Sequence, residues 1–84
     1  MEVKNNIKIY SLTPREIEVI KLLAQFKNNK TISDELFISE STVKAHISSI
    51  LRKLNVSNRF QCVLICLKTG IIKPDDIKIQ LKNR

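Results

Sequence analysis

Apolar residues recur at helical spacing in four separate parts of the chain. In the first part, Val19, Leu22, Leu23 and Phe26 follow one another at offsets of three, four and seven. Such offsets place side chains on one face of a helix. We therefore expect an all-α fold, a compact four-helix domain whose helices lie near residues 13–26, 29–37, 40–54 and 58–69.

Residues that favour helix ends flank these segments. Thr13 can cap the first helix, Pro14 suits its first position, and Glu16 can complete a capping box. The only glycine of the chain, Gly70, is the expected left-handed stop of the last helix. The caps expected for the second, third and fourth helices are Asn28, Ser39 and Ser57.

The two ends of the chain lack this helical pattern. We expect an N-terminal arm at residues 1–11 and a C-terminal extension at residues 73–84. Alternating apolar residues in these segments are Ile7, Ile9, Ile77, Ile79 and Leu81. They are compatible with extended arms, with a short final turn after Pro74, or with disorder.

The second and third segments together have the pattern of a helix-turn-helix. A short helix, a tight turn and a longer capped helix follow one another, with an apolar core between them. The core positions are Ile32, Leu36, Ile38, Val43 and Ile47. The opposite stripe of the longer helix is small or basic: Ser41, Lys44, Ala45, Ser48 and Arg52. A face of this kind suits the DNA major groove, which admits one helix.

The charge distribution supports a polyanionic partner. The net charge is +7 and the sequence pI is about 9.7. No acidic residue lies between Ser41 and Pro74, whereas that stretch holds Lys44, Arg52, Lys53, Arg59, Lys68 and Lys73. Positive charge without interruption attracts polyanions. The alternative is a solvated basic face with no partner.

Several other classes of protein are disfavoured by composition. No apolar run approaches the ~20 residues that span a bilayer, and the N-terminus lacks a signal-peptide core, so we expect a cytoplasmic protein with no membrane partner. Two cysteines and one histidine are too few for a disulfide framework or a four-ligand zinc site. The sequence has no acid–base pair beside a nucleophile and no glycine-rich phosphate loop, which argues against an enzyme or a bound cofactor.

An ordered run of residues resembles a known family. Leu12-Thr13-Pro14-Arg15-Glu16-Ile17-Glu18-Val19 is similar to the opening of the LuxR-type, or GerE-like, DNA-binding domain. The resemblance continues through Asn29-Lys30 and Ile38-Ser39-Glu40-Ser41-Thr42-Val43-Lys44, and then through Lys53-Leu54, Val56 and Asn58-Arg59. It covers about residues 12–72. Phe26 departs from it, since the family often has glycine there; phenylalanine disfavours the left-handed conformation, so we expect Lys27 or Asn28 to adopt it instead.

The resemblance implies a transcriptional regulator that binds double-stranded DNA, with the helix at 40–54 in the major groove. This domain is usually attached to a receiver or ligand-binding domain. The few residues before Leu12 are too short for either, so we expect a free-standing effector domain, with a fragment of a longer regulator as the alternative.

The resemblance also implies roles for individual residues. The expected base contacts are Lys44, Ala45 and Ser48. The expected contacts to the DNA backbone are Asn29, Lys30, Ser41, Thr42, His46, Ser49, Arg52 and Lys53. The expected contacts of a homodimer on DNA, through the helix at 58–69, are Gln61, Leu64, Ile65 and Lys68.

Some of these residues have structural alternatives. Lys44 could neutralise a phosphate rather than contact a base. Arg59 could tie the last helix to the one before it, through carbonyls or Glu16, as readily as it could contact DNA. Cys62 and Cys66, one helical turn apart, are interpreted as core residues.

A second class of function fits the same pattern. The basic stripe could meet an acidic surface on RNA polymerase or another regulator, which would make the chain a protein-binding adaptor. The absence of acidic residues from 41 to 74 favours DNA over this alternative. RNA or single-stranded binding is less favoured, because the few aromatic residues stand mostly at core-like positions.

Overall fold

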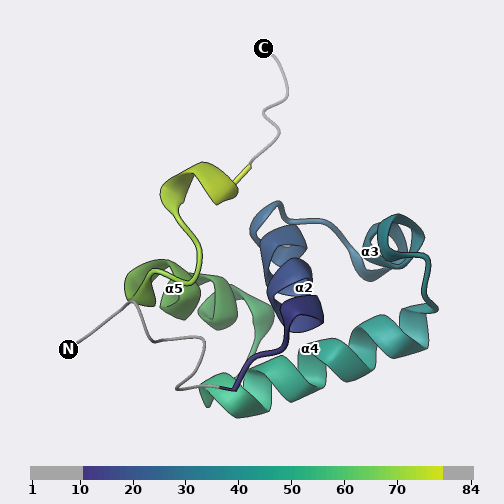
Figure 1. The fold of residues 1–84 in the computed structure, drawn as a ribbon, viewed down its shortest axis with the longest axis horizontal. Helices are drawn as coiled ribbons and strands as arrows, with labels where there is room; N and C mark the ends of the chain where they lie inside the picture. Colours follow the sequence, from purple (N-terminus) through teal and green to yellow (C-terminus); the bar gives the residue numbers. More distant parts are fainter. Residues whose placement is uncertain (1–10, 79–84) are drawn as a thin grey trace.

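The fold is all-α, as the apolar pattern predicts. The computed structural model describes residues 11–78, and residues 1–10 and 79–84 lie outside the described range. In order, the described elements are α2 (Pro14–Ala24), α3 (Asn29–Leu36), α4 (Glu40–Leu54), α5 (Arg59–Thr69) and the short 3-10 helix η1 (Pro74–Asp76). Figure 1 shows α2 standing over the middle of α4, with α3 near one end of α4 and α5 near the other.

Most of the predicted helix ends are confirmed. The Thr13 hydroxyl accepts from the Glu16 amide at 3.0 Å, and Glu16 Oε1 accepts from the Thr13 amide at 2.9 Å, which completes the capping box. Asn28 caps α3 and Ser39 caps α4, each through its side chain. Gly70 ends α5 in the left-handed conformation with φ 85°. These caps satisfy backbone amides that a helix leaves without internal partners.

The cap of α5 is Asn58, and the prediction of Ser57 is wrong. Asn58 Oδ1 accepts from the Gln61 amide at 2.9 Å, so the helix begins at Arg59. The Gln61 side chain reaches back and accepts from the Ser57 amide at 2.8 Å. Ser57 therefore lies one residue before the cap. Its amide donates to the Gln61 side chain, and its own side chain does not cap the helix.

Phe26 itself takes the left-handed conformation, so the expectation for Lys27 or Asn28 is wrong. Its φ is 60°, and α2 ends at Ala24, two residues earlier than predicted. Asn28 is not available for that role, because it must be extended (φ −81°) to cap α3. Phe37 follows α3 in the same conformation with φ 58°, so this helix ends at Leu36, one residue before the predicted end.

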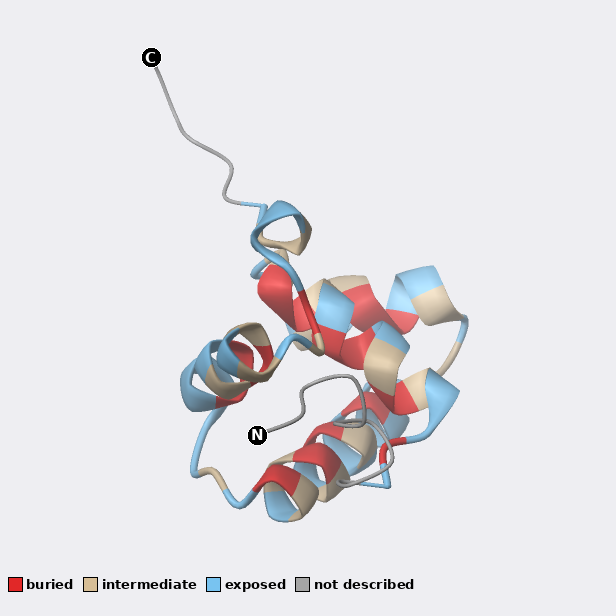
Figure 2. Ribbon diagram, turned by 60° about the vertical axis from the view of Figure 1, so that its left-hand side comes forward, coloured by how far each residue is buried: buried red, intermediate tan, exposed pale blue. Residues whose placement is uncertain are grey.

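The core is formed by the faces that the helices turn toward one another. Figure 2 shows the buried residues as stripes along α2, α4 and α5. The buried apolar side chains include Val19, Ile20, Leu23, Ile32, Val43, Ile50, Cys62, Cys66 and Ile72. Both cysteines are completely buried, as the core interpretation expects. Burial of this apolar surface is the main favourable contribution to folding.

The helix-turn-helix core is also confirmed. Ile32, Val43 and Ile47 are buried, and Leu36 and Ile38 are half-buried against them. Ser33 is small enough to be buried in the same contact, and its hydroxyl donates to the Lys30 carbonyl at 2.7 Å. The buried hydroxyl is thereby satisfied without a partner from another helix.

A short final turn follows Pro74, one of the three alternatives for this segment. The Lys73 amide donates to Asp76 Oδ2 at 2.8 Å, and the Lys78 amide donates to the Ala24 carbonyl at 3.3 Å. Ile77 is half-buried against the core, so the extension packs near the end of α2. The other alternating residues, Ile7, Ile9, Ile79 and Leu81, lie outside the described range.

A buried carboxylate joins the start of α2 to the second half of α4. Glu16 is 4% exposed. Its Oε1 accepts from Lys53 Nζ at 2.8 Å, and its Oε2 accepts from the Ser49 hydroxyl at 2.9 Å. Lys53 also donates to the Ser11 carbonyl at 2.9 Å. The carboxylate that caps α2 therefore also fixes how α4 lies beneath it.

The environment of Glu16 favours its charged form. Burial by itself raises the pKa of the Glu16 carboxyl. Hydrogen bonds from Lys53, Thr13 and Ser49, together with the Lys53 charge, outweigh burial and hold that pKa below its ordinary value. The ionised carboxylate consequently stabilises the folded state.

Replacing Glu16 with glutamine should lower the free energy of unfolding by about 1–3 kcal/mol, because the Lys53 ammonium loses its carboxylate partner in a largely buried setting. Thermal unfolding at neutral pH measures this change. Glu18→Gln is the matched control, since Glu18 forms an exposed pair with Arg15 at 3.2 Å. Its effect should stay within about 0.5 kcal/mol; an equal loss in both variants would contradict the role given to Glu16.

The Glu16 contribution should also depend on pH in a defined direction. Because the folded-state pKa is lowered, the contribution is complete above the unfolded pKa of about 4.3 and disappears as pH falls through the folded value. Stability of the natural chain should therefore fall toward acid more steeply than that of Glu16→Gln. Parallel stability curves below about pH 4.3 would contradict this assignment.

Candidate nucleic-acid interface

Helix α4 has one face in the core and one face on the surface. Val43, Ile47, Ile50 and Leu54 are buried. The opposite stripe is exposed and consists of Ser41, Lys44, Ala45, Ser48 and Arg52. This outward stripe matches the one that the sequence predicts, and it bears two positive charges and no negative charge. An exposed face with this charge suits a polyanion.

Lys44, Ala45 and Ser48 occupy neighbouring positions on this outward stripe. All three are exposed, and none has a hydrogen bond or ion pair through its side chain among the described residues. Lys44 and Ser48 are four residues apart, so their side chains share one face of the helix. Their side chains are therefore available to a ligand, whereas their contact with bases stays a prediction.

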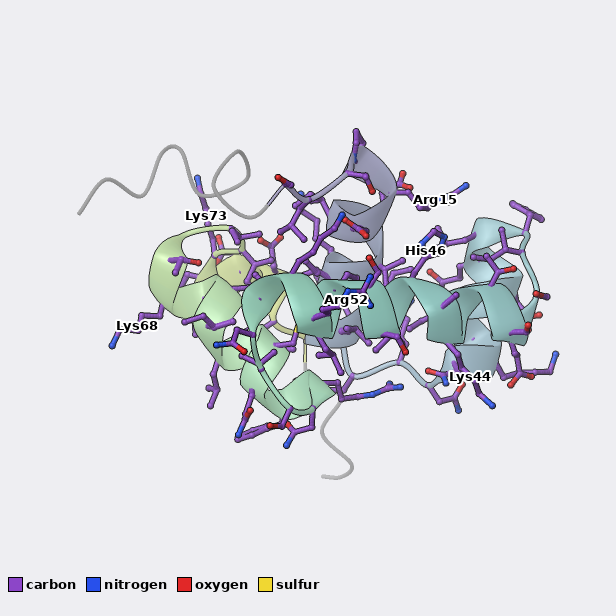
Figure 3. All side chains as sticks on the ribbon, turned by 90° about the horizontal axis from the view of Figure 1, so that it is seen from below. Arg15, Lys44, His46, Arg52, Lys68 and Lys73 are labelled. Atoms are coloured by element: carbon purple, nitrogen blue, oxygen red, sulfur yellow. The ribbon has the colours of Figure 1, made fainter. Side chains whose placement is uncertain are left out.

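The basic side chains of α4 and those of the C-terminal elements lie in different places relative to the outward stripe. In Figure 3, Lys44 and Arg52 lie along α4, with Lys44 toward the α3 end and Arg52 in the last turn. Lys68 and Lys73 lie beyond the other end of α4. A duplex lying along the outward stripe would therefore be closer to Lys44 than to Lys73.

The other α4 candidates for backbone contacts fall into two groups. Ser41, Thr42 and Arg52 are exposed, and His46 is half-buried. Thr42 also has a local role, because its amide donates to the capping Ser39 hydroxyl at 3.0 Å and the two hydroxyls lie 2.9 Å apart. Thr42 thus supports the first turn of α4 while its side chain remains at the surface.

Ser49 and Lys53 form the second group and face inward toward α2. Both donate to the buried Glu16 carboxylate. Their hydrogen bonds give them a definite structural role in holding α4. The backbone contacts that the resemblance implies for them stay a prediction, as do those of the first group.

Asn29 and Lys30, at the start of α3, have partners within the chain. Asn29 Oδ1 accepts from Arg59 Nη2 at 2.6 Å, and Lys30 pairs with Asp34 at 3.3 Å on the surface. Arg59 also donates to the Lys27 carbonyl at 3.4 Å. The structural role of Arg59 is therefore to tie α5 to the connection between α2 and α3, rather than to α4 or Glu16 as the sequence suggested.

The candidate dimer contacts lie on α5. Gln61, Leu64 and Lys68 are exposed, and Leu64 retains 49% of its surface although it is apolar. Ile65 is only half-buried and packs against the core. The described part of the C-terminal extension leaves Leu64 uncovered. Their role in a dimer stays a prediction.

Arg15 is a surface cation that is absent from the DNA contacts expected from the sequence. It is half-buried in the first turn of α2 and forms an exposed pair with Glu18. Figure 3 places it on the same side of α4 as His46. The sequence signal was present in Thr13-Pro14-Arg15-Glu16, but that run indicates a helix start and does not reveal which other helix lies beside it.

Residues 11–78 hold neither a candidate membrane span nor a candidate metal site. None of the helices described is long and apolar enough to cross a bilayer. Within the same residues, His, Cys, Asp and Glu side chains do not gather in a group of three or more that could hold a metal ion.

Comparisons with known proteins agree with this arrangement. The sequence profile of the bacterial regulatory proteins of the luxR family, named GerE, matches residues 10–66. The spore germination protein GerE of Bacillus subtilis is 52% identical over 59 residues, which cover 70% of this chain and 80% of that protein. A solved structure of the transcription factor GerE superposes with a TM-score of 0.68 at 47% identity, covering 71% of this chain and 90% of that one.

Longer regulators are similar in one part only. The transcriptional regulatory protein DegU of Brevibacillus brevis is 43% identical over 72 residues, which cover 86% of this chain and 30% of that protein. The chain thus spans about a third or less of this relative's length. The profile match and the GerE likeness together show that the chain belongs to the luxR family of bacterial regulatory proteins and forms that family's helix-turn-helix DNA-binding domain.

Proposed function

We propose that the chain is a sequence-specific transcriptional regulator that acts in the cytoplasm on double-stranded DNA. Helix α4 enters the major groove, and two copies join through α5 on paired half-sites. The observation that carries this proposal is the outward stripe of α4, which is exposed, small or basic and free of acidic residues while the opposite face is buried. Such a stripe allows close approach to base edges and phosphates.

Two parts of α4 have different tasks in this proposal. The outward stripe carries Lys44, Ala45 and Ser48, which face the bases. Lys44 suits guanine as a donor, and the Ala45 methyl suits the methyl of thymine. The second half is held against α2 by Glu16 through Ser49 and Lys53. A rigidly held second half fixes the angle at which the first half enters the groove.

Contacts to phosphates surround the base-reading residues. The exposed or half-buried candidates on α4 are Ser41, Thr42, His46 and Arg52, and we add Arg15 on the His46 side. Asn29, Lys30, Ser49 and Lys53 remain candidates, with the condition that each would have to share its side chain with a partner inside the chain. Phosphate contacts contribute affinity and register without selecting sequence.

Dimerisation through α5 is supported by the exposed Leu64 between the polar Gln61 and Lys68. An apolar side chain with polar neighbours is typical of a small interface. Two copies related by a two-fold axis would present their α4 helices to half-sites about one helical turn apart. RNA polymerase remains a further partner only if the adaptor alternative applies.

Lys44→Ala should weaken binding to the selected site by about 1–3 kcal/mol and relax the preference at one base position. Selection from random duplexes followed by sequencing, and titration at several salt concentrations, measure both effects. Lys73→Ala removes the same charge beyond the other end of α4 and should leave base preference unchanged. Equal losses on every sequence would reduce Lys44 to a phosphate contact, and a failure to select any motif would favour the adaptor.

Leu64→Glu should abolish cooperative binding to paired half-sites while binding to one half-site is kept, because it places a charge in the proposed interface. Leu64 is preferred to Ile65 for this test, since Ile65 packs against the core and a charge there would disturb the fold. Titrations of paired and single half-site duplexes measure the difference. Unchanged cooperativity would remove Leu64 from the interface.

A further inference from the structure

A pocket of about 260 Å³ lies between the end of α2, the start of α3 and the start of α5. Its lining is Leu23, Phe26, Lys27, Asn28, Arg59, Phe60 and Val63. None of these residues belongs to α4 or is among the residues proposed to contact DNA, although Arg59 donates a hydrogen bond to one of those, Asn29. An apolar cavity of about 150 Å³ can hold benzene, so this one has room for an aromatic ring with a short side arm.

The lining combines an apolar floor with positive charge. Leu23 and Val63 are buried, whereas the rings of Phe26 and Phe60 are 54% and 62% exposed at the surface. Two cations, Lys27 and Arg59, are part of the lining, and no acidic residue is. The chemistry that complements such a pocket is an apolar group carrying a negative charge.

Arg59 is the cation whose charge is least compensated. Lys27 pairs with the Glu35 carboxylate, which offsets its charge. Arg59 donates to two uncharged acceptors, the Lys27 carbonyl and Asn29 Oδ1, and no carboxylate pairs with it in the described residues. Those hydrogen bonds also fix the guanidinium at the pocket. A guanidinium that is held in place and lacks a counter-charge favours a carboxylate, which it can bind through two donors.

Phe26 is an unusual residue for its position. A left-handed residue at a helix end is commonly glycine, and a bulky side chain there carries a conformational cost. Phe26 accepts that conformation with its ring in the pocket wall. The ring therefore offers an aromatic surface that glycine could not supply.

We propose that this pocket binds a small aromatic carboxylate, with the ring between Phe26 and Phe60 and the carboxylate toward Arg59. The site goes beyond the proposed DNA binding. Because its lining connects α2, α3 and α5, an occupant would stabilise the arrangement of three helices.

The experiment titrates the full chain, labelled with ¹⁵N, with sodium 3-phenylpropionate at constant ionic strength while amide chemical shifts are followed. Saturable shifts confined to the pocket lining are expected, with a Kd in roughly the millimolar range for a ligand of this size. The neutral 3-phenylpropanamide has the same ring and should bind about five-fold more weakly, because it lacks the charge that Arg59 recognises.

Two glycine variants give a matched comparison. Phe26→Gly removes the pocket wall, and Phe37→Gly removes a 93% exposed phenylalanine that has nearly the same backbone conformation but lies outside the pocket. Glycine suits both conformations, so both variants should fold. Phe26→Gly should weaken binding of 3-phenylpropionate about five-fold, whereas Phe37→Gly should leave it unchanged.

Three results would overturn the proposal. The first is a set of shifts that does not saturate or that spreads over the whole surface. The second is equal binding of the carboxylate and the amide, since charge recognition would then be absent. The third is equal binding by the Phe26→Gly and Phe37→Gly variants, because Phe26 would then not form the site.

Discussion

The interaction on which the rest of the structure depends is the buried carboxylate of Glu16. One side chain caps α2, accepts from Ser49 and pairs with Lys53, so it joins α2 to α4. An ionised group in an apolar interior is costly unless it is paired and hydrogen-bonded. Here each carboxylate oxygen has partners, and the charge therefore fixes the relative position of two helices instead of destabilising them.

The position of α4 in turn determines which charges meet the solvent. The apolar residues of α4 lie on its buried face, and Ser49 and Lys53 in its second half donate hydrogen bonds to Glu16. Lys44, Ser48 and Arg52 remain outward with no acidic neighbour on that stripe. The protein thus keeps part of its positive charge for internal structure and part for a polyanion. A basic composition alone does not distinguish these two uses.

The phenylalanines at the ends of α2 and α3 illustrate a second constraint. Both adopt a conformation that suits glycine, yet the chain has a single glycine, at the end of α5. Each connection is short, and the residues after it must already be extended to cap the next helix. The reversal falls two residues before each cap, at Phe26 and Phe37. In Phe26 this places an aromatic ring at the junction of three helices, beside Arg59.

The amino-acid sequence by itself determined the helices, most of their caps and the outward stripe of α4. These features depend on local spacing and on caps within three residues, such as Thr13 with Glu16 and Ser39 with Thr42. The sequence did not distinguish Asn58 from Ser57 as the cap of α5, because both residue types can cap a helix. In the structure the Gln61 side chain accepts from the Ser57 amide, and Asn58 accepts from the Gln61 amide.

Only the tertiary structure decided what Lys53, Ser49 and Arg59 contact. The partners of these side chains lie 30 or more residues away in the chain, so a local sequence pattern could not reveal them. In the sequence, Lys53 and Lys44 are alike as basic residues of one helix. The rotation of that helix relative to α2 places Lys53 beside Glu16 and leaves Lys44 at the surface. That rotation is set by packing of the apolar faces together with the Glu16 contacts, so long-range contacts rather than residue type determine which side chains have an internal partner.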